Sequence, residues 1–174
     1  MFLLKFISSL GIFLTSTIIG HLYGQKFTSR YENLIYMNQC IKILETEIVY
    51  GSTPLPDALS NVYRKGKQKV SYIFKEIKED LLINKPSDLS SSFLSVEDKM
   101  YRDLSFNKAD VEMFLSLGRV LGTSDRLDQQ KNIALVLNQM DGLISEARLE
   151  KTKNEKLYKS LGIITGIGII ILLI

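Results

Sequence analysis

The sequence has few of the residue types on which most enzyme sites depend. Its 174 residues include one cysteine, one histidine, three prolines and no tryptophan. A single cysteine, Cys40, excludes an internal disulfide and a cysteine-only metal site. Since Cys40 lies among aliphatic residues in a helical pattern, we expect a small buried side chain there rather than a nucleophile. The only histidine, His21, lies in an apolar N-terminal stretch, so no histidine triad or His/Cys zinc site is expected elsewhere.

Phosphate-binding loops are also missing. The sequence contains neither GxxxxGK[ST] nor GxGxxG, so a nucleotide-binding fold would have no loop to hold phosphates. Acidic pairs such as Glu45/Glu47 and Asp125/Asp128 are interpreted as solvated helix faces. No nucleophile–base pair is visible. We therefore expect no enzyme, no cofactor, no metal and no small-molecule substrate.

Charge of one sign is not in large excess. The formal net charge is +3, and acidic residues alternate with basic ones, which argues against nucleic acid as a partner. One basic cluster surrounds Gly66 and consists of Arg64, Lys65, Lys67 and Lys69. It could bind phosphate, but we favour a solubility role for it.

Both ends of the chain are apolar. Residues 6–23 are almost wholly apolar or small and carry no charge; as a helix they would rise about 27 Å, close to the thickness of a bilayer core. We expect a membrane anchor over residues 1–24, with a cleaved signal peptide as the alternative. The last fourteen residues are uncharged too. They predict a short C-terminal anchor over residues 159–174, with a core helix as the alternative.

The charged residues next to the two apolar ends predict on which side of the membrane residues 25–158 lie. Basic residues follow the first apolar stretch and precede the second, which places the middle in the cytoplasm by the positive-inside rule. Each end also has a small-xxx-small spacing that lets two helix backbones approach closely. These pairs are Gly20 with Gly24, and Gly162 with Gly166.

The middle of the chain shows helical periodicity and no strand pattern. Apolar residues recur at helical spacing, for example Leu34, Ile41 and Leu44 in the first helix, and the stripe from Val70 to Leu82 in the third. The expected helices cover about residues 27–50, 54–64, 70–83, 89–104, 107–121 and 125 onward. The predicted fold is all-α: a compact bundle of about six helices with an apolar membrane helix at each terminus.

Turn and capping residues separate the first helices. Gly51 is expected to end the first helix in a left-handed conformation. Ser52 or Thr53 would then cap the next helix, with Pro54 at its first position.

Capping residues also mark the later helices. Asn107 is expected to cap the fifth helix, with Asp110 in its first turn. Gly122 would break the chain, and Thr123 or Ser124 would cap the last helix ahead of Asp125. Because no proline follows, this helix can continue to the C-terminus.

Three segments resemble the stage III sporulation protein AB family of endospore-forming bacteria. They are EIVYGSTPLPDAL (Glu47 to Leu59), LGRVLGTSDRLDQQK (Leu117 to Lys131) and KLYKSLGIITGIGIIILLI (Lys156 to Ile174). The resemblance covers essentially the whole chain and is weakest between Asn84 and Lys99. The positions that match the family pattern are Gly51, Thr53, Pro54, Leu55, Gly118, Gly122, Thr123 and Asp125, and we interpret them first as caps, turns and packing residues.

The resemblance implies a function that composition does not. It implies a non-enzymatic platform subunit of the complex linking mother cell and forespore, at the mother-cell side of the forespore-surrounding membrane. Its bundle would be similar to the cytoplasmic domains of type II secretion platform proteins. The expected partners are the stage III sporulation protein AA ATPase, other subunits of the same complex and the membrane. A general membrane-anchored helical scaffold without a motor partner is the alternative.

Overall fold

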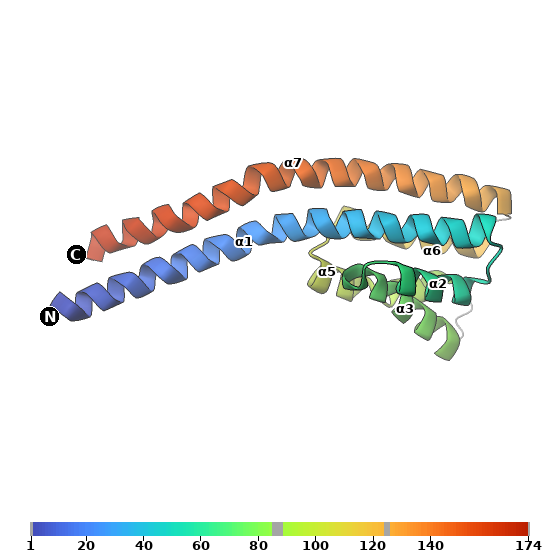
Figure 1. Cartoon of the computed structure of the whole chain (residues 1–174), viewed down its shortest axis with the longest axis horizontal. Helices are drawn as coiled ribbons and strands as arrows, with labels where there is room; N and C mark the ends of the chain where they lie inside the picture. Colours follow the sequence, from blue (N-terminus) through green and yellow to red (C-terminus); the bar gives the residue numbers. More distant parts are fainter. Residues whose placement is uncertain (1, 85–88, 124–125, 174) are drawn as a thin grey trace. The chain divides into compact units, whose positions relative to one another are not determined.

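The regular structure of the described part of the chain is entirely helical. The computed structural model describes the backbone of residues 2–84, 89–123 and 126–173, and the side chains of residues 8–84, 89–121 and 128–171. The elements are α1 (Phe2–Glu45), η1 (Thr46–Tyr50), α2 (Leu55–Lys65), α3 (Gln68–Ile83), α4 (Leu89–Leu94), α5 (Glu97–Leu104), α6 (Lys108–Thr123) and α7 (Arg126–Leu173) (Figure 1). The all-α prediction is confirmed.

The chain divides into two compact units. One contains residues 1–31 and 146–174, which are the outer parts of α1 and α7. The other contains residues 32–145 and holds the inner parts of these two helices together with η1 and α2 to α6. We call them the terminal helix pair and the bundle.

The bundle has one apolar core. Helix α1 contributes Leu34, Met37, Ile41 and Leu44, and all four are fully buried. A cluster of three phenylalanines joins the later helices: Phe74 of α3 meets Phe114 of α6 edge-on at 5.6 Å, and Phe93 of α4 lies 5.5 Å from the same ring. Burial of each ring contributes about 1.5–3 kcal/mol.

Gly118 makes this ring cluster possible. A Cβ built at this position would lie 2.7 Å from Cγ of Phe93 and 2.9 Å from its Cβ. Any larger residue would therefore push α4 away from α6. The residue is a packing glycine, which agrees with the interpretation given to the family-pattern positions.

Several predicted helix ends are found close to where the sequence placed them. Helix α2 ends at Lys65 with Gly66 as its C-cap residue, and α3 ends at Ile83. Asn107 and Asp110 form a reciprocal pair at the start of α6: the Asp110 N–H donates to Asn107 Oδ1, and the Asn107 N–H donates to Asp110 Oδ2, both at 2.9 Å. Such a pair satisfies two N–H groups that have no partner within the helix.

Other predicted details are wrong. The stretch 89–104 forms two helices rather than one. Gly122 does not break the chain, because α6 continues through Thr123, and Asp125 lies outside the described residues. Leu82, assigned to an apolar stripe that faces the core, is 51 % exposed. No residue of α3 after Ile77 is buried, so the buried stripe ends before Leu82.

The predicted membrane helix at each terminus is also wrong. Among the described residues, no helix has a stretch that is both long and apolar enough to cross a membrane. The physical reason lies in the composition of the two ends. Serine, threonine, glycine and His21 interrupt the described part of the N-terminal apolar stretch, and the apolar C-terminal run that begins at Leu161 has only fourteen residues.

The two ends instead pair with each other. A Cβ built on Gly20 would lie 2.6 Å from the carbonyl oxygen of Tyr158 and 2.8 Å from Cα of Gly162, so α1 and α7 touch backbone to backbone. Ser16 Oγ donates a 2.7 Å hydrogen bond to the carbonyl oxygen of Gly162. Gly24 and Gly166 also face the opposite helix: a Cβ built on Gly24 would lie 3.2 Å from the Glu155 carbonyl oxygen, and one built on Gly166 would lie 3.3 Å from the Phe13 ring.

Aromatic and charged contacts extend this pairing along the helices. The ring of Tyr158 stacks on Phe27 at 5.7 Å and on Tyr23 at 6.0 Å. Arg30, only 5 % exposed, donates to Glu150 at 2.6 Å and lies 3.6 Å from Glu146. Removal of one partner from a buried ion pair leaves an uncompensated charge, so Arg30 holds the two helices in one register.

Candidate functional site

The corner between η1 and α2 has an unusual backbone. The end of α1 widens into the π-helical turn Thr46–Tyr50, a type of turn that is rare and frequent at functional sites. Gly51 follows with φ −79°, so it is not the left-handed residue that the sequence predicted. Ser52 takes that role with φ 52°, a conformation that costs energy for a residue with a side chain.

Gly51 is required for a different reason. A Cβ at this position would lie 2.8 Å from the carbonyl oxygen of Glu47 and 3.0 Å from Oγ1 of Thr53. The Gly51 N–H donates to the backbone carbonyl oxygen of Thr46, and the Thr53 N–H donates to the backbone carbonyl oxygen of Glu47, both at 2.9 Å. These bonds close the corner so tightly that only glycine fits at its start.

The predicted cap of α2 is also different. Pro54 is the N-cap residue, the helix begins at Leu55, and no side chain caps it. Instead the Thr53 hydroxyl donates to the Glu47 carboxylate at 3.0 Å. The prediction was wrong because the sequence showed a capping residue next to a helix, but not the acidic partner six residues earlier.

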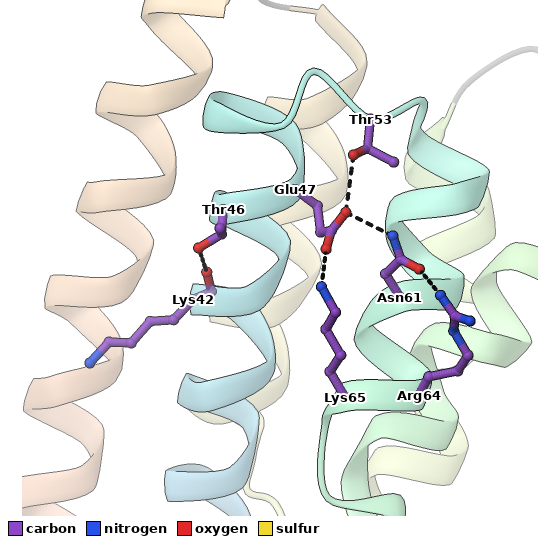
Figure 2. Close-up of polar contacts among 7 residues, drawn as sticks. All are labelled: Lys42, Thr46, Glu47, Thr53, Asn61, Arg64 and Lys65. Carbon is purple, nitrogen blue, oxygen red and sulfur yellow. Dashed lines mark hydrogen bonds and ion pairs between the residues drawn. The ribbon is translucent and has the colours of Figure 1, made fainter.

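Glu47 is the centre of the corner (Figure 2). Its carboxylate accepts hydrogen bonds from Thr53, from Asn61 Nδ2 at 2.7 Å and from Lys65 Nζ at 2.6 Å. These donors, Lys65 first and then Asn61 and Thr53, lower the pKa of the carboxyl group from 4.5 to about 2. Glu47 is therefore ionised at neutral pH and ties η1 to both ends of α2.

Sequence reasoning missed the role of Glu47 and assigned it to a solvated helix face. The signal was present, since Glu47 is the first residue of the quoted segment Glu47 to Leu59. Its donors lie one turn apart on α2, at positions 61 and 65, so a carboxylate facing that helix can bind both.

The basic cluster around Gly66 is largely occupied by contacts within the bundle. Lys65 binds Glu47, and Arg64 donates to Asn61 Oδ1. The ammonium group of Lys67 lies 5.6 Å from the centre of the Tyr36 ring, a cation–π distance. These contacts favour a structural role over phosphate binding.

Two of the quoted segments meet beside this corner. An open cavity of about 360 Å³ lies between them. Its lining comes from the first segment (Ile48, Ser52, Thr53 and Leu55) and from the second segment (Leu121 and Gln129). We call it the corner groove. Positions about seventy residues apart in the sequence thus form one surface.

The chemistry of the corner groove suits binding rather than catalysis. Its lining is apolar or neutral and polar, with no titratable group among the described residues that line it. Elsewhere, the described residues contain no cluster of three or more histidine, cysteine or acidic side chains that could hold a metal ion. Cys40 is fully buried, and this burial raises the pKa of its thiol to about 12, the opposite of what a nucleophile needs.

The remaining family-pattern positions lie around this region. Pro54 and Leu55 start α2 beside the groove, and Gly118 packs against Phe93 one turn before Leu121. Gly122 and Thr123 are the last residues of α6, but their side chains are outside the described part of the chain. The four glycines at the termini lie in the helix pair, not at this groove.

The fold and this surface define a class of protein: an all-helical protein with a preformed binding groove and no visible catalytic site in its described residues. Comparison with known proteins gives the family. The model of the stage III sporulation protein AB family matches residues 5–174, and the chain belongs to that family.

Individual relatives agree with the family assignment. The chain is 31 % identical over 172 residues to stage III sporulation protein AB of Bacillus subtilis (strain 168), covering 98 % of this chain and 99 % of that protein. A solved structure titled stage III sporulation protein AB has a TM-score of 0.63 and 28 % identity to this chain. The match covers 71 % of this chain and 96 % of that one. The resemblance inferred from the three segments is confirmed.

Proposed function

We propose that the chain is a non-enzymatic platform subunit of the complex that links mother cell and forespore, and that its corner groove docks a cytoplasmic secretion-type ATPase. The ATPase is the sibling stage III sporulation protein AA. The observation that carries this proposal is the convergence of two family-like segments on one open groove. Family membership supports a role in sporulation. The choice of an ATPase as the partner rests on what the family resemblance implies.

The construction of the groove supports docking of a protein rather than turnover of a substrate. Glu47, Thr53, Asn61 and Lys65 hold the corner in one conformation. A rigid surface loses little conformational entropy when a partner binds. Apolar side chains such as Leu55 at an open site provide area to bury, while Ser52 and Gln129 provide hydrogen bonds, which is the usual composition of an interface.

Co-purification of the ATPase tests the docking surface. Leu55→Lys places a charge in the groove and should lower the recovered ATPase by about tenfold or more, the loss typical of a central interface residue. The matched control is Leu135→Lys on α7, where the native side chain is 59 % exposed and lies outside the groove. This control should leave recovery unchanged.

Two results would count against the proposal. If Leu55→Lys folds with an unchanged thermal unfolding midpoint and still recovers the ATPase, the corner groove is not the docking surface. If the wild-type chain recovers no ATPase at all, the helical scaffold without a motor partner becomes the better explanation.

We also propose the location that the resemblance implies: the mother-cell side of the forespore-surrounding membrane, with the bundle in the cytoplasm. This location requires no membrane-spanning helix, because a subunit bound to membrane partners is found where they are. A fluorescent fusion imaged during engulfment would show a ring around the forespore. Uniform fluorescence through the mother cell would contradict the proposal.

A further inference from the structure

A second groove, which shares no lining residue with the corner groove, lies between α6 and α7. It has a volume of about 500 Å³ and is open and mainly apolar. Helix α6 lines it with Ala109, Met113 and Ser116, and helix α7 with Gln139 and Gly142. An apolar cavity of about 150 Å³ already accommodates benzene, so this groove has room for two aliphatic side chains.

Packing within the bundle does not require a glycine at position 142. A Cβ built at Gly142 would meet nothing within 4 Å, in contrast to Gly51, Gly66 and Gly118, whose neighbours require glycine. Glycine weakens a helix interior relative to alanine. Packing within the chain therefore does not explain this residue, whereas close approach of an external group does.

The same bundle exposes two apolar side chains, Leu82 and Ile83, whose chemistry matches the mainly apolar lining of this groove. We call them the knob. Leu82 and Ile83 form the last turn of α3 and are 51 % and 78 % exposed. Ile83 is the most exposed of the bundle's large apolar side chains among the described residues. Lys78 lies one turn before Leu82 on the same helix face and has no ion-pair partner among the described residues.

Charge complements shape. The one charged side chain among the described residues lining the groove is Glu112, whose contact with Lys108 is long, at 3.6 Å, and solvent-exposed. Such a pair contributes little, so Glu112 is available to a second cation. An apolar knob preceded by a lysine thus fits an apolar groove bordered by a glutamate.

We propose that the knob of one copy, Leu82 and Ile83, docks in the α6/α7 groove of a second copy, with Lys78 facing Glu112. Knob and groove are different surfaces, so the contact is heterologous and joins copies head to tail into a ring or a filament. In a filament only the two terminal copies keep a free groove or a free knob, and in a closed ring no copy does. The inference does not depend on the corner groove or on the ATPase.

Cysteine cross-linking of the full chain in spore-forming cells tests this arrangement. One tagged copy carries Ile83→Cys and a differently tagged copy carries Ala109→Cys; both native side chains are exposed. A short bismaleimide should join the two tags, because the knob of one copy lies in the groove of the other. Cys40 is buried and stays unmodified. Pairs in which both copies carry the same substitution should not cross-link.

A groove-filling variant makes the test specific. Gly142→Leu directs a side chain into the groove and should lower the cross-linked fraction by about tenfold or more. Gly142→Ala is the graded comparison: it adds only one methyl group to the groove and should lower the cross-linked fraction less than Gly142→Leu does. A Cβ at position 142 would meet nothing within 4 Å, and the thermal unfolding midpoint of each variant checks that it folds.

The proposal is overturned by any of three results. These are no cross-link between Ile83→Cys and Ala109→Cys, cross-links only between identical substitutions, and undiminished cross-linking in Gly142→Leu.

Discussion

Glu47 illustrates how one side chain determines a local structure. It is the only acceptor shared by Thr53, Asn61 and Lys65 among the described contacts of the corner. Charge-assisted hydrogen bonds of this kind are stronger than neutral ones. The strained Ser52 conformation persists because this carboxylate holds the residues that follow it.

Replacement of Glu47 by glutamine should destabilise the chain at neutral pH and not at low pH. The folded carboxyl group has a pKa of about 2, below its ordinary 4.5, so its stabilising effect is complete above pH 4.5 and is lost as pH falls toward 2. Thermal unfolding midpoints of wild type and Glu47→Gln, measured from pH 7 to pH 2, should differ at the upper end and converge at the lower end. A difference that stays constant over this range would show that ionisation of Glu47 is irrelevant.

Cys40 is a residue whose role the sequence did predict. Its aliphatic neighbours at helical spacing indicated burial, and the side chain is fully buried. Because burial also raises the pKa of the thiol to about 12, very little thiolate exists at pH 8.

Reaction of Cys40 with a disulfide reagent at pH 8 should be on the order of a hundredfold slower in the native chain than in denaturant. The rate of thiol release measures this directly. A native rate close to the denatured rate would mean that the bundle opens around Cys40 far more easily than its packing indicates.

At the scale of helices, the glycines divide into those that the packing requires and those that it does not. Gly20 and Gly162 contact each other's backbone, whereas Gly11 and Gly168 have nothing within 4 Å of an added Cβ. The spacing Gly20/Gly24 and Gly162/Gly166 is visible in the sequence, but the opposite helix is not. The partner could be identified only from the structure, because any apolar helix could have approached such a face.

Gly20→Leu should separate the terminal helix pair. The added side chain would overlap the Tyr158 carbonyl and the Gly162 backbone, neither of which can move aside without shifting a helix. A disulfide between Phe13→Cys and Gly166→Cys, which face each other across the pair, should form in the parent and fall by on the order of tenfold in Gly20→Leu. Gly11→Leu serves as the control and should leave disulfide formation unchanged.

Capping shows a second limit of sequence reasoning at this scale. Asn107 and Asp110 were predicted correctly because both partners lie within one turn of each other. Thr53 was assigned to the wrong partner because Glu47 reaches it across the corner. Local pairs can be predicted from spacing, whereas pairs that depend on a π-helical turn cannot, since the turn shifts the register by a residue.

For the whole molecule, helical periodicity predicted the all-α bundle and most of its core. The corner groove was not predicted, although both of its segments had been singled out as family-like. Segments that carry a resemblance need not be neighbours in space, and only the packing of α6 and α7 against the corner brings Leu121 and Gln129 beside Leu55. The membrane helices were predicted from apolar composition and helix length, and they are not supported by the described helices.

The measurement that tests the central claim most directly is the heat-resistant spore count of a strain that lacks the gene and carries one of three copies. We predict that the wild-type chain and Leu135→Lys restore spores, whereas Leu55→Lys does not, with normal vegetative growth and equal protein levels in all three strains. This result would place the function in sporulation and at the corner groove. Full restoration by Leu55→Lys, or normal spore counts without any copy, would contradict the account.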